Sequence, residues 1–202
     1  MDFKNIYLVR HGKIGRDADG KTYIGQVDIP LNGDGREQAE NLGRRLKEIN
    51  ISNIICSDLI RSVETAEIIA AHHNLSPVII PSLKEISMGD WEGITFAEIM
   101  KRSPDEYKKR GADILNYRTP GGESFADLRE RVIPAFLKIA DSASGDIVIS
   151  GHAGVNRIIL CHILGLPYEK MFNIPQDYGC INRIFAGISN FRVVLLNDTG
   201  KL

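Results

Sequence analysis

The chain has 202 residues, of which 43% are hydrophobic and 25% are charged, so one domain with a substantial core is expected. Lys and Arg number 25 against 26 Asp and Glu, a net charge of -1 that excludes the basic field of a general nucleic-acid-binding protein. Three widely spaced cysteines argue against a disulfide framework. No signal peptide is expected, and no run of about 18 apolar residues predicts a membrane-spanning helix. These features predict a soluble, cytoplasmic protein that binds neither nucleic acid nor membranes.

The first half of the chain alternates short apolar runs with segments of helical spacing. Asn32 and Asp34 are N-cap candidates for a helix whose apolar positions continue to Ile49. In chain order, the elements predicted up to residue 100 are a strand at Ile6–Val9, this helix, a strand at Asn53–Cys56, a helix at Leu59–His72, a strand at Val78–Ile80 and a short helix at Phe96–Met100.

The second half begins with a polar stretch. Residues 103–122 are predicted as a loop because they contain Pro and Gly, within a lid or insert over residues 86–122. Ser124 is predicted to cap a helix in which Pro134 marks a kink or a boundary. The remaining elements are a strand at Ile147–Ile149, a helix at Gly154–Leu164 and a hairpin of Arg183–Ala186 with Phe191–Leu196. Strands separated by helices predict a single α/β domain over residues 1–202, a three-layer sandwich with a mostly parallel sheet flanked by helices.

The ends of four predicted strands carry the residues that suggest chemistry. They are Arg10-His11-Gly12, Ser57 with Arg61 one helical turn further on, Glu85, and Gly151-His152-Ala153-Gly154. Because the carboxyl ends of parallel strands meet at one edge of a sheet, we expect these groups to lie together. Arginine matches phosphoryl oxygens with a planar fork, glycine permits close backbone approach, and a helix N-terminus attracts anions. A histidine in such surroundings can attack phosphorus while a carboxylic acid protonates the departing oxygen.

These strand ends belong to a longer, ordered set of motifs. In chain order the set is Leu8–Gly12, Gly25–Asn32, Cys56–Arg61, Leu83–Glu85, Gly89–Gly93, Gly121–Phe125 and Gly151–Val155. With this set the chain resembles the histidine phosphatase superfamily, in its phosphoglycerate mutase-like branch. The resemblance implies the phosphoglycerate mutase-like form of the sandwich and a phosphatase that needs neither a metal nor another cofactor.

The resemblance also implies roles for individual residues. His11 would be the nucleophile that becomes phosphohistidine, and Glu85 would donate a proton to the leaving group. Arg10, Arg61 and a cationic His152 would bind the transferring phosphoryl group and supply the positive charge that a metal supplies elsewhere. Further contacts with the substrate are expected from Gly12, Lys13, Gly25 and Ala153.

Within the superfamily, the Gly25–Asn32 stretch, the loop around Gly121 and Tyr178-Gly179 are most similar to α-ribazole-5′-phosphate phosphatases of cobalamin biosynthesis. The expected partner is therefore a small-molecule phosphomonoester, with α-ribazole 5′-phosphate first. A broad-specificity or sugar-phosphate phosphatase, a phosphoglycerate mutase and a non-catalytic phosphate-binding module remain alternatives. The family includes monomers and dimers, so a homodimer also stays open.

Two positions depart from the family pattern. Lys13 stands where many members have Glu or Gln, and Asp17 stands in place of an Asn that touches the phosphate. We expect Lys13 to add positive charge near the substrate. Asp17 is expected to point away from the phosphate or to pair with Arg16 or Lys21, because an unpaired carboxylate would repel it.

Several other residues have competing interpretations. A zinc site of His11, His152 and Glu85 has suitable ligands, but the neighbouring arginines would repel the cation. His72-His73 is more simply a helix C-terminus than a metal site. Trp91 is equally suited to stack on a substrate or to anchor a loop, whereas Tyr107 and Tyr117 are candidates for contacting a base or sugar.

Overall fold

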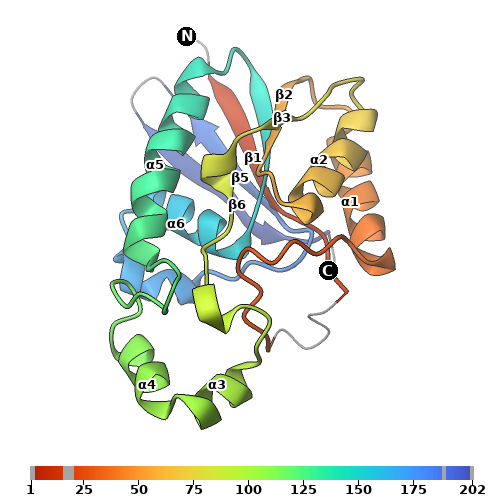
Figure 1. Ribbon diagram of the computed structural model, residues 1–202. Coiled ribbons are helices and arrows are strands. Elements are labelled where there is room, and N and C mark those ends of the chain that lie inside the picture. Colours follow the sequence, from red (N-terminus) through yellow and green to blue (C-terminus); the bar gives the residue numbers. More distant parts are fainter. Residues whose placement is uncertain (1–2, 16–20, 188–189, 201–202) are drawn as a thin grey trace.

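A six-stranded sheet forms the centre of the molecule in the computed structural model, which describes residues 3–15, 21–187 and 190–200 (Figure 1). The strands are β1 (Lys4–Arg10), β2 (Ile51–Cys56), β3 (Val78–Ile79), β4 (Asp146–Gly151), β5 (Ile181–Ala186) and β6 (Phe191–Asp198). Their order in the sheet is β3-β2-β4-β1-β5-β6, with β1 to β4 parallel and the β5–β6 hairpin antiparallel. The predicted α/β sandwich with a mostly parallel sheet is confirmed.

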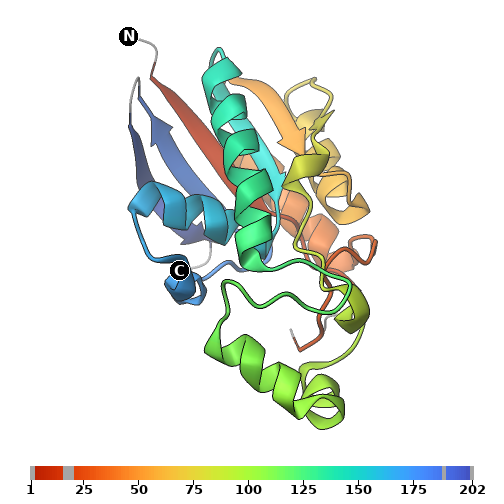
Figure 2. The ribbon, with the colours of Figure 1, turned by 60° about the vertical axis from the view of Figure 1, so that its left-hand side comes forward.

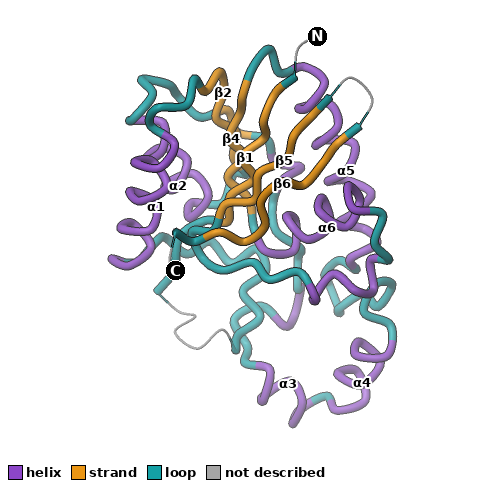
Figure 3. Tube along the Cα trace, turned by 180° about the vertical axis from the view of Figure 1, so that it is seen from behind, coloured by secondary structure: helices purple, strands orange, loops and turns teal. Residues whose placement is uncertain are grey.

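Helices cover both faces of this sheet (Figure 3). On one face lie α1 (Gly33–Leu46) and α2 (Ile60–Ala71), and on the other lie α5 (Phe125–Ser142) and α6 (Ala153–Leu164). Two short helices, α3 (Phe96–Arg102) and α4 (Pro104–Ala112), stand apart from the sheet, at the end where β1 and β4 finish (Figures 1 and 2). Three 3-10 turns complete the chain at Pro81–Leu83, Gly89–Trp91 and Tyr168–Asn173.

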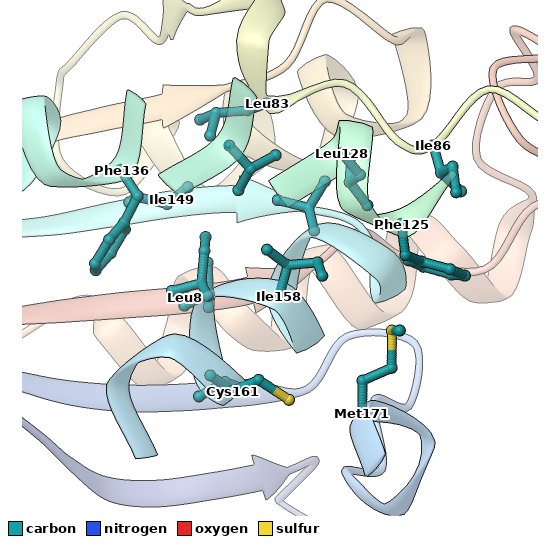
Figure 4. Close-up of a cluster of buried hydrophobic side chains, with 14 of the residues drawn as sticks. Leu8, Leu83, Ile86, Phe125, Leu128, Phe136, Ile149, Ile158, Cys161 and Met171 are labelled. Carbon is teal, nitrogen blue, oxygen red and sulfur yellow. The ribbon is translucent and has the colours of Figure 1, made fainter. Parts of the chain in front are cut away.

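Strand β1 shows why the sheet needs cover on both faces. Ile6 and Leu8 pack on the side of α5 and α6, whereas Tyr7 and Val9 pack on the side of α1 and α2. Successive side chains of a strand point to opposite faces, so a strand that is apolar at every position must be covered on both of its faces. Figure 4 shows Leu8 within the first of these clusters, near Ile158.

The helix signals in the sequence act as predicted at two N-termini. The Asn32 side chain accepts a hydrogen bond from the backbone N–H of Gly35 at 2.8 Å and caps α1. Ser124 caps α5 in a reciprocal capping box with Asp127. Pro134 does not end α5, which continues to Ser142, and the proline is exposed on this helix.

The loop predicted over residues 103–122 is wrong for its first part, since α4 occupies Pro104–Ala112. Pro104 stands at the first turn together with Asp105 and Glu106, and Lys109 and Arg110 stand in the last turn, all favourable positions for those residues. No residue of α4 is buried, so the apolar stripe by which a helix is normally recognised is missing.

The three cysteines are buried thiols that form no disulfide, as the sequence predicted. Within the described ranges, no helix combines the length and the apolar character that crossing a lipid bilayer requires.

Candidate active site

The carboxyl ends of the central strands bring the predicted residues to one cleft. Arg10 at the end of β1 is in register with Gly151 at the end of β4, and the backbone N–H of His11 donates to the Gly151 carbonyl at 3.1 Å. The rings of His11 and His152 lie 5.1 Å apart. A cleft of about 320 Å³ opens here, and the predicted residues among those lining it are Arg10, His11, Gly25, Arg61, Glu85, Ala153 and Gly154.

His11 is oriented so that one ring nitrogen is free to react. Its Nδ1 lies 2.7 Å from the carbonyl oxygen of Gly12, which can only accept a hydrogen bond. Nδ1 therefore carries the hydrogen, and Nε2 keeps its lone pair. Burial, followed by the charges of Arg61 and Arg10, lowers the pKa of His11 well below its usual value. The imidazole is thus neutral near pH 7, the form that a nucleophile requires.

The two arginines are held by backbone carbonyls. Nη1 of Arg10 donates to the Gln176 carbonyl at 2.5 Å, and its guanidinium lies 3.6 Å from the ring centre of Tyr178. Arg61 is 1% exposed, and its two terminal nitrogens donate to the carbonyls of Val27 and Gly25 at 2.7 Å each. Both guanidinium groups are therefore fixed before any anion binds.

His152 begins α6 and is completely buried. Its Nε2 lies 2.7 Å from the hydroxyl oxygen of Ser57, the residue that follows β2. Burial, together with the charges of Arg61, His11 and Arg10, lowers the pKa of His152 well below its usual value. The sequence predicted a cationic His152, but its surroundings in the protein stabilise the neutral imidazole instead.

Three buried nitrogens around His11 have no hydrogen-bond partner among the described residues: Nε of Arg10, Nε of Arg61 and Nδ1 of His152. Buried polar atoms are normally paired, so three unpaired nitrogens at one place are unusual. The two Nε atoms are obligate donors. An anion with several acceptor oxygens would satisfy them together, which is the chemistry of a phosphoryl group.

Glu85 is fixed by the start of α6. One carboxylate oxygen accepts from the Ile86 N–H and the other from the Gly154 N–H, each at 2.9 Å. A Cβ added to Gly154 would lie 2.4 Å from Glu85 Oε1. Gly154 therefore permits the close approach of this carboxylate to the start of α6.

Gly12 and Gly25 likewise contact other parts of the protein. A Cβ on Gly12 would lie 2.2 Å from the carbonyl oxygen of Gly35, so the two backbones touch. Gly25 has a φ of +53°, which glycine adopts without strain, and its carbonyl accepts from Arg61. In the structure, Gly12 therefore contributes backbone packing and Gly25 the orientation of Arg61.

Arg131, on α5, is a residue that the sequence interpretation missed. Its guanidinium donates to the carbonyls of Ser82, Lys84 and Glu85 at 2.7–2.9 Å and pairs with Glu123 at 2.8 Å. This side chain clamps the segment that carries Glu85. The only signal in the sequence was Glu123, in the Gly121–Phe125 motif, whose partner could not be read without the fold.

The outer half of the cleft is built from several segments: the loop around Tyr23, the segment 86–122, the start of α5, α6, and the residues between α6 and β5. Its aromatic lining consists of Tyr23, Phe96, Tyr107, Phe125, Phe172 and Tyr178. Two arginines that were not predicted, Arg110 and Arg157, line it as well.

Of the aromatic candidates, only Tyr107 lines the cleft. Trp91 is 4% exposed and packs against Tyr23 and Tyr117, with ring centres 5.2 and 6.0 Å away, so it anchors the loop. The hydroxyl of Tyr117 donates to Glu106 at 2.7 Å and ties α4 to the following loop.

Of the two positions that depart from the family pattern, the structure describes Lys13, which does not line the catalytic cleft. Nζ of Lys13 pairs with Asp34 at 3.0 Å and lines a neighbouring pocket with Gln38 and Asp177, while the cleft of His11 does not include it. Asp17 and its predicted partner Arg16 lie outside the described residues.

The candidate metal ligands do not come together. His72 pairs with Glu40 at 3.1 Å. Among the side chains that the structure describes, no three His, Cys, Asp or Glu residues are grouped to hold a metal ion, and this includes His11, His152 and Glu85.

Comparison with known proteins agrees with this geometry. The family model of the histidine phosphatase superfamily (branch 1) matches residues 6–199. The chain belongs to this superfamily. It is a phosphatase, as are many of its relatives.

Three similar proteins illustrate the range of the relationship. The adenosylcobalamin/alpha-ribazole phosphatase of Escherichia coli K12 is 30% identical over 187 residues, which cover 90% of this chain and 92% of that protein. The phosphoglycerate mutase-like protein 4 of Arabidopsis thaliana is 38% identical over 161 residues, or 78% and 70% of the two chains. A crystal structure of a putative alpha-ribazole-5′-P phosphatase from E. coli has a TM-score of 0.90 at 28% identity, covering 97% of both chains.

Proposed function

We propose that the protein hydrolyses a small-molecule phosphomonoester without a metal, through a phosphohistidine at His11. The observation that carries this proposal is the set of three unpaired buried nitrogens of Arg10, Arg61 and His152 around a neutral imidazole. They supply the donors that an attacked phosphoryl group needs, and Nε2 of His11 supplies the electron pair.

The reaction has two displacements at phosphorus. In the first, Nε2 of His11 forms a bond to phosphorus while the bond to the alcohol oxygen breaks, and Glu85 gives that oxygen its proton. In the second, Glu85 takes a proton from water, whose oxygen attacks phosphorus and releases His11. Ester and water are thereby converted to alcohol and inorganic phosphate, and every group of the enzyme returns to its initial state.

For the substrate we propose α-ribazole 5′-phosphate as the leading candidate. A protein sequence and a crystal structure from E. coli carry this activity in their names, at 28–30% identity over 90% or more of the chain. An outer cleft lined by aromatic rings also suits the aromatic base of such a compound.

The first experiment separates substrate from mechanism. Phosphate release would be measured, with a chelator present, from α-ribazole 5′-phosphate, mononucleotides, sugar phosphates and 3-phosphoglycerate. A kcat/KM far higher for α-ribazole 5′-phosphate supports the full proposal. A flat profile supports a broad-specificity phosphatase, and release from none of them would favour a mutase or a phosphate-binding module.

The second experiment tests the covalent intermediate. Rapid acid-free quenching with a substrate labelled in its phosphoryl group should trap label on the protein in an acid-labile, alkali-stable bond. His11→Ala should abolish this label. The matched control is His162→Ala, which removes an exposed histidine of α6 outside the cleft and should trap label as the unaltered protein does. Label retained by His11→Ala would remove His11 from the nucleophile's role.

A further inference from the structure

Arg10 contacts an irregular segment of the chain, residues 176–180, which leads into β5. Nη1 of Arg10 donates to the Gln176 carbonyl at 2.5 Å, and the Arg10 backbone N–H donates to the Cys180 carbonyl at 3.2 Å. An irregular segment lacks the regular hydrogen bonds that fix the backbone of a strand or a helix. The position of Arg10 therefore depends on the side chains that hold residues 176–180 in place.

Three amide side chains connect this segment to the sheet and to α6, and we call them the amide cluster: Gln176, Asn182 of β5 and Asn156 of α6. Nε2 of Gln176 donates to Oδ1 of Asn182 at 2.9 Å, and Nδ2 of Asn182 donates back to Oε1 of Gln176 at 3.0 Å. Nδ2 of Asn156 donates to the same Oε1 at 3.0 Å. Nδ2 of Asn182 also donates to the Leu8 carbonyl at 3.0 Å, so the cluster is tied to the strand that ends in Arg10.

The amide cluster is almost completely buried. Gln176 is 3% exposed, and Asn156 and Asn182 are 0% exposed. Oδ1 of Asn156 has no hydrogen-bond partner among the described residues, so the burial of this amide costs stability. Apolar side chains of similar size would avoid this cost, but they could not fix the segment by directed hydrogen bonds. Groups that cost stability in this way are typical of functional sites, and the site residue that Gln176 contacts is Arg10.

Strand β6 holds the same segment through Asn197. This residue has a φ of +51°, a left-handed conformation that asparagine adopts more readily than most residues. Its backbone N–H donates to Oδ1 of Asn182 at 2.9 Å. Its side chain binds Asp177 twice, since Nδ2 donates to the carboxylate and Oδ1 accepts from the backbone N–H, each at 2.7 Å. Residues 176 and 177 are therefore fixed by α6, β5 and β6 together.

The groups that hold Arg10 through Gln176 are neutral. The Gln176 carbonyl and the amide cluster carry no charge, and among the described side chains no carboxylate forms an ion pair with Arg10. A carboxylate would bind the guanidinium more strongly than a carbonyl does, but it would also compete with a phosphoryl group for it. A neutral carbonyl orients Arg10 while the positive charge stays available to an anion.

We propose that the amide cluster positions Arg10 for phosphoryl binding, by fixing the Gln176 carbonyl that orients the guanidinium. This inference rests on the proposed function, because it takes Arg10 to bind the phosphoryl group. Nη1 of Arg10 is used by the Gln176 carbonyl, whereas Nε is buried and unpaired. A guanidinium that turns away from this carbonyl would withdraw Nε from the anion. Loss of the cluster should therefore weaken phosphate binding, although none of its side chains needs to touch the phosphate.

The affinity for inorganic phosphate, measured by calorimetry, reports this role. Arg10→Met should weaken phosphate binding about 100-fold. Gln176→Met removes the side-chain amide but keeps the backbone carbonyl, and it should weaken binding about ten-fold. Asn156→Ala removes one hydrogen bond to Gln176 Oε1 and should weaken binding about three-fold. The values of kcat/KM for p-nitrophenyl phosphate should fall in the same order, because this ester needs no proton from Glu85.

A double-mutant cycle separates positioning from a general loss of structure. When Gln176→Met is added to Arg10→Met, phosphate affinity should change by less than about two-fold, because the cluster then has no guanidinium to orient. The matched control is Asn5→Ala, which removes an amide at the opposite end of β1, where Nδ2 donates to Asp146 at 3.0 Å. This control should lower the thermal unfolding midpoint and leave phosphate affinity unchanged.

Two results would overturn the positioning role. One is that folded Gln176→Met and Asn156→Ala bind phosphate as the unaltered protein does, and the other is that Gln176→Met weakens binding equally with and without Arg10. If Gln176→Met does not fold, Asn156→Ala takes its place in the same cycle. If Arg10→Met binds phosphate normally, or the unaltered protein binds none, the proposed function is contradicted, and the positioning role fails with it.

Discussion

The inner and outer halves of the cleft are built differently. In the inner half, the side chains of Arg10, Arg61 and Glu85 each bond to backbone groups of loops or of the first turn of α6. In the outer half, Arg110 and Arg157 lie against aromatic rings, and the backbone holds only one nitrogen of Arg157. Side chains that the backbone holds in place suit catalysis, because catalytic groups must not move from their positions. Side chains that pack on other side chains suit substrate contacts, because their surroundings change when neighbouring residues are substituted.

The largest effect should follow the loss of the inner nucleophile. His11→Ala should lower kcat by roughly four orders of magnitude while the thermal unfolding midpoint stays close to that of the unaltered protein, because an attacking atom has no substitute. Stopped assays of phosphate release, with the unfolding curve as control, measure both. A folded variant with more than a few per cent of the activity would contradict the nucleophilic role.

Glu85→Gln tests whether Glu85 protonates the leaving group. We expect kcat for an alkyl phosphate to fall by about 10²–10⁴, and kcat for p-nitrophenyl phosphate to fall far less, because p-nitrophenolate leaves without protonation. The measurement is kcat across a series of leaving groups of different pKa. Equal losses for all leaving groups would show that Glu85 serves binding or structure.

Arg131→Gln should weaken the same step indirectly. Without its hydrogen bonds to the carbonyls of Ser82, Lys84 and Glu85, the acid loses its position, and kcat for poor leaving groups should fall about ten-fold with KM nearly constant. The neighbouring Arg129→Gln, which breaks an exposed pair with Glu130, is the matched control. A loss that is independent of the leaving group would mean that Arg131 only supports folding.

The pH dependence of kcat/KM should reflect the lowered pKa of the buried His11. The pKa of His11 is lowered by burial and by Arg61 and Arg10, so the neutral nucleophile persists below pH 6.5. An unshifted imidazole would be about one-tenth neutral at pH 5.5, whereas we expect kcat/KM there to exceed half of its plateau after correction for the ionisation of the substrate. An acid limb with its midpoint at or above pH 6.5 would contradict this assignment.

The smallest effect is expected in the outer half. Tyr117→Phe removes the hydrogen bond to Glu106 at 2.7 Å and should lower the free energy of unfolding only slightly, because the Glu106 carboxylate is open to water. Because this tyrosine lines no part of the cleft, kcat should stay within about two-fold. Denaturant titration and measurement of kcat together test this prediction. A large loss of kcat would mean that the contacts of Tyr117 affect the catalytic groups of the inner half.

The same division explains what the sequence could predict. Arg10, His11 and His152 could be predicted to lie close together because they stand at the ends of apolar strands, and parallel strands end at one edge of a sheet. Glu85 follows the edge strand β3 after a 3-10 turn. Capping by Asn32 and Ser124 was read correctly because such signals are local.

Features set by tertiary contacts escaped the sequence. Helix α4 has no buried residue and so gave no apolar period, and Arg131 and Arg157 owe their positions to segments far away in the chain. The close approaches of Gly12 to Gly35 and of Gly154 to Glu85 could not be predicted either, because each joins residues far apart in the chain.

The position of β1 affects how the protein is made. Strand β1 is synthesised before both of its partners, β4 and β5, so Ile6 must wait for Ile147 and Ile184 to be synthesised. At about 5–20 residues per second, that wait is on the order of ten to forty seconds. During this time the apolar Ile6–Val9 segment has no sheet to join, although in the folded protein none of its residues is more than 6% exposed.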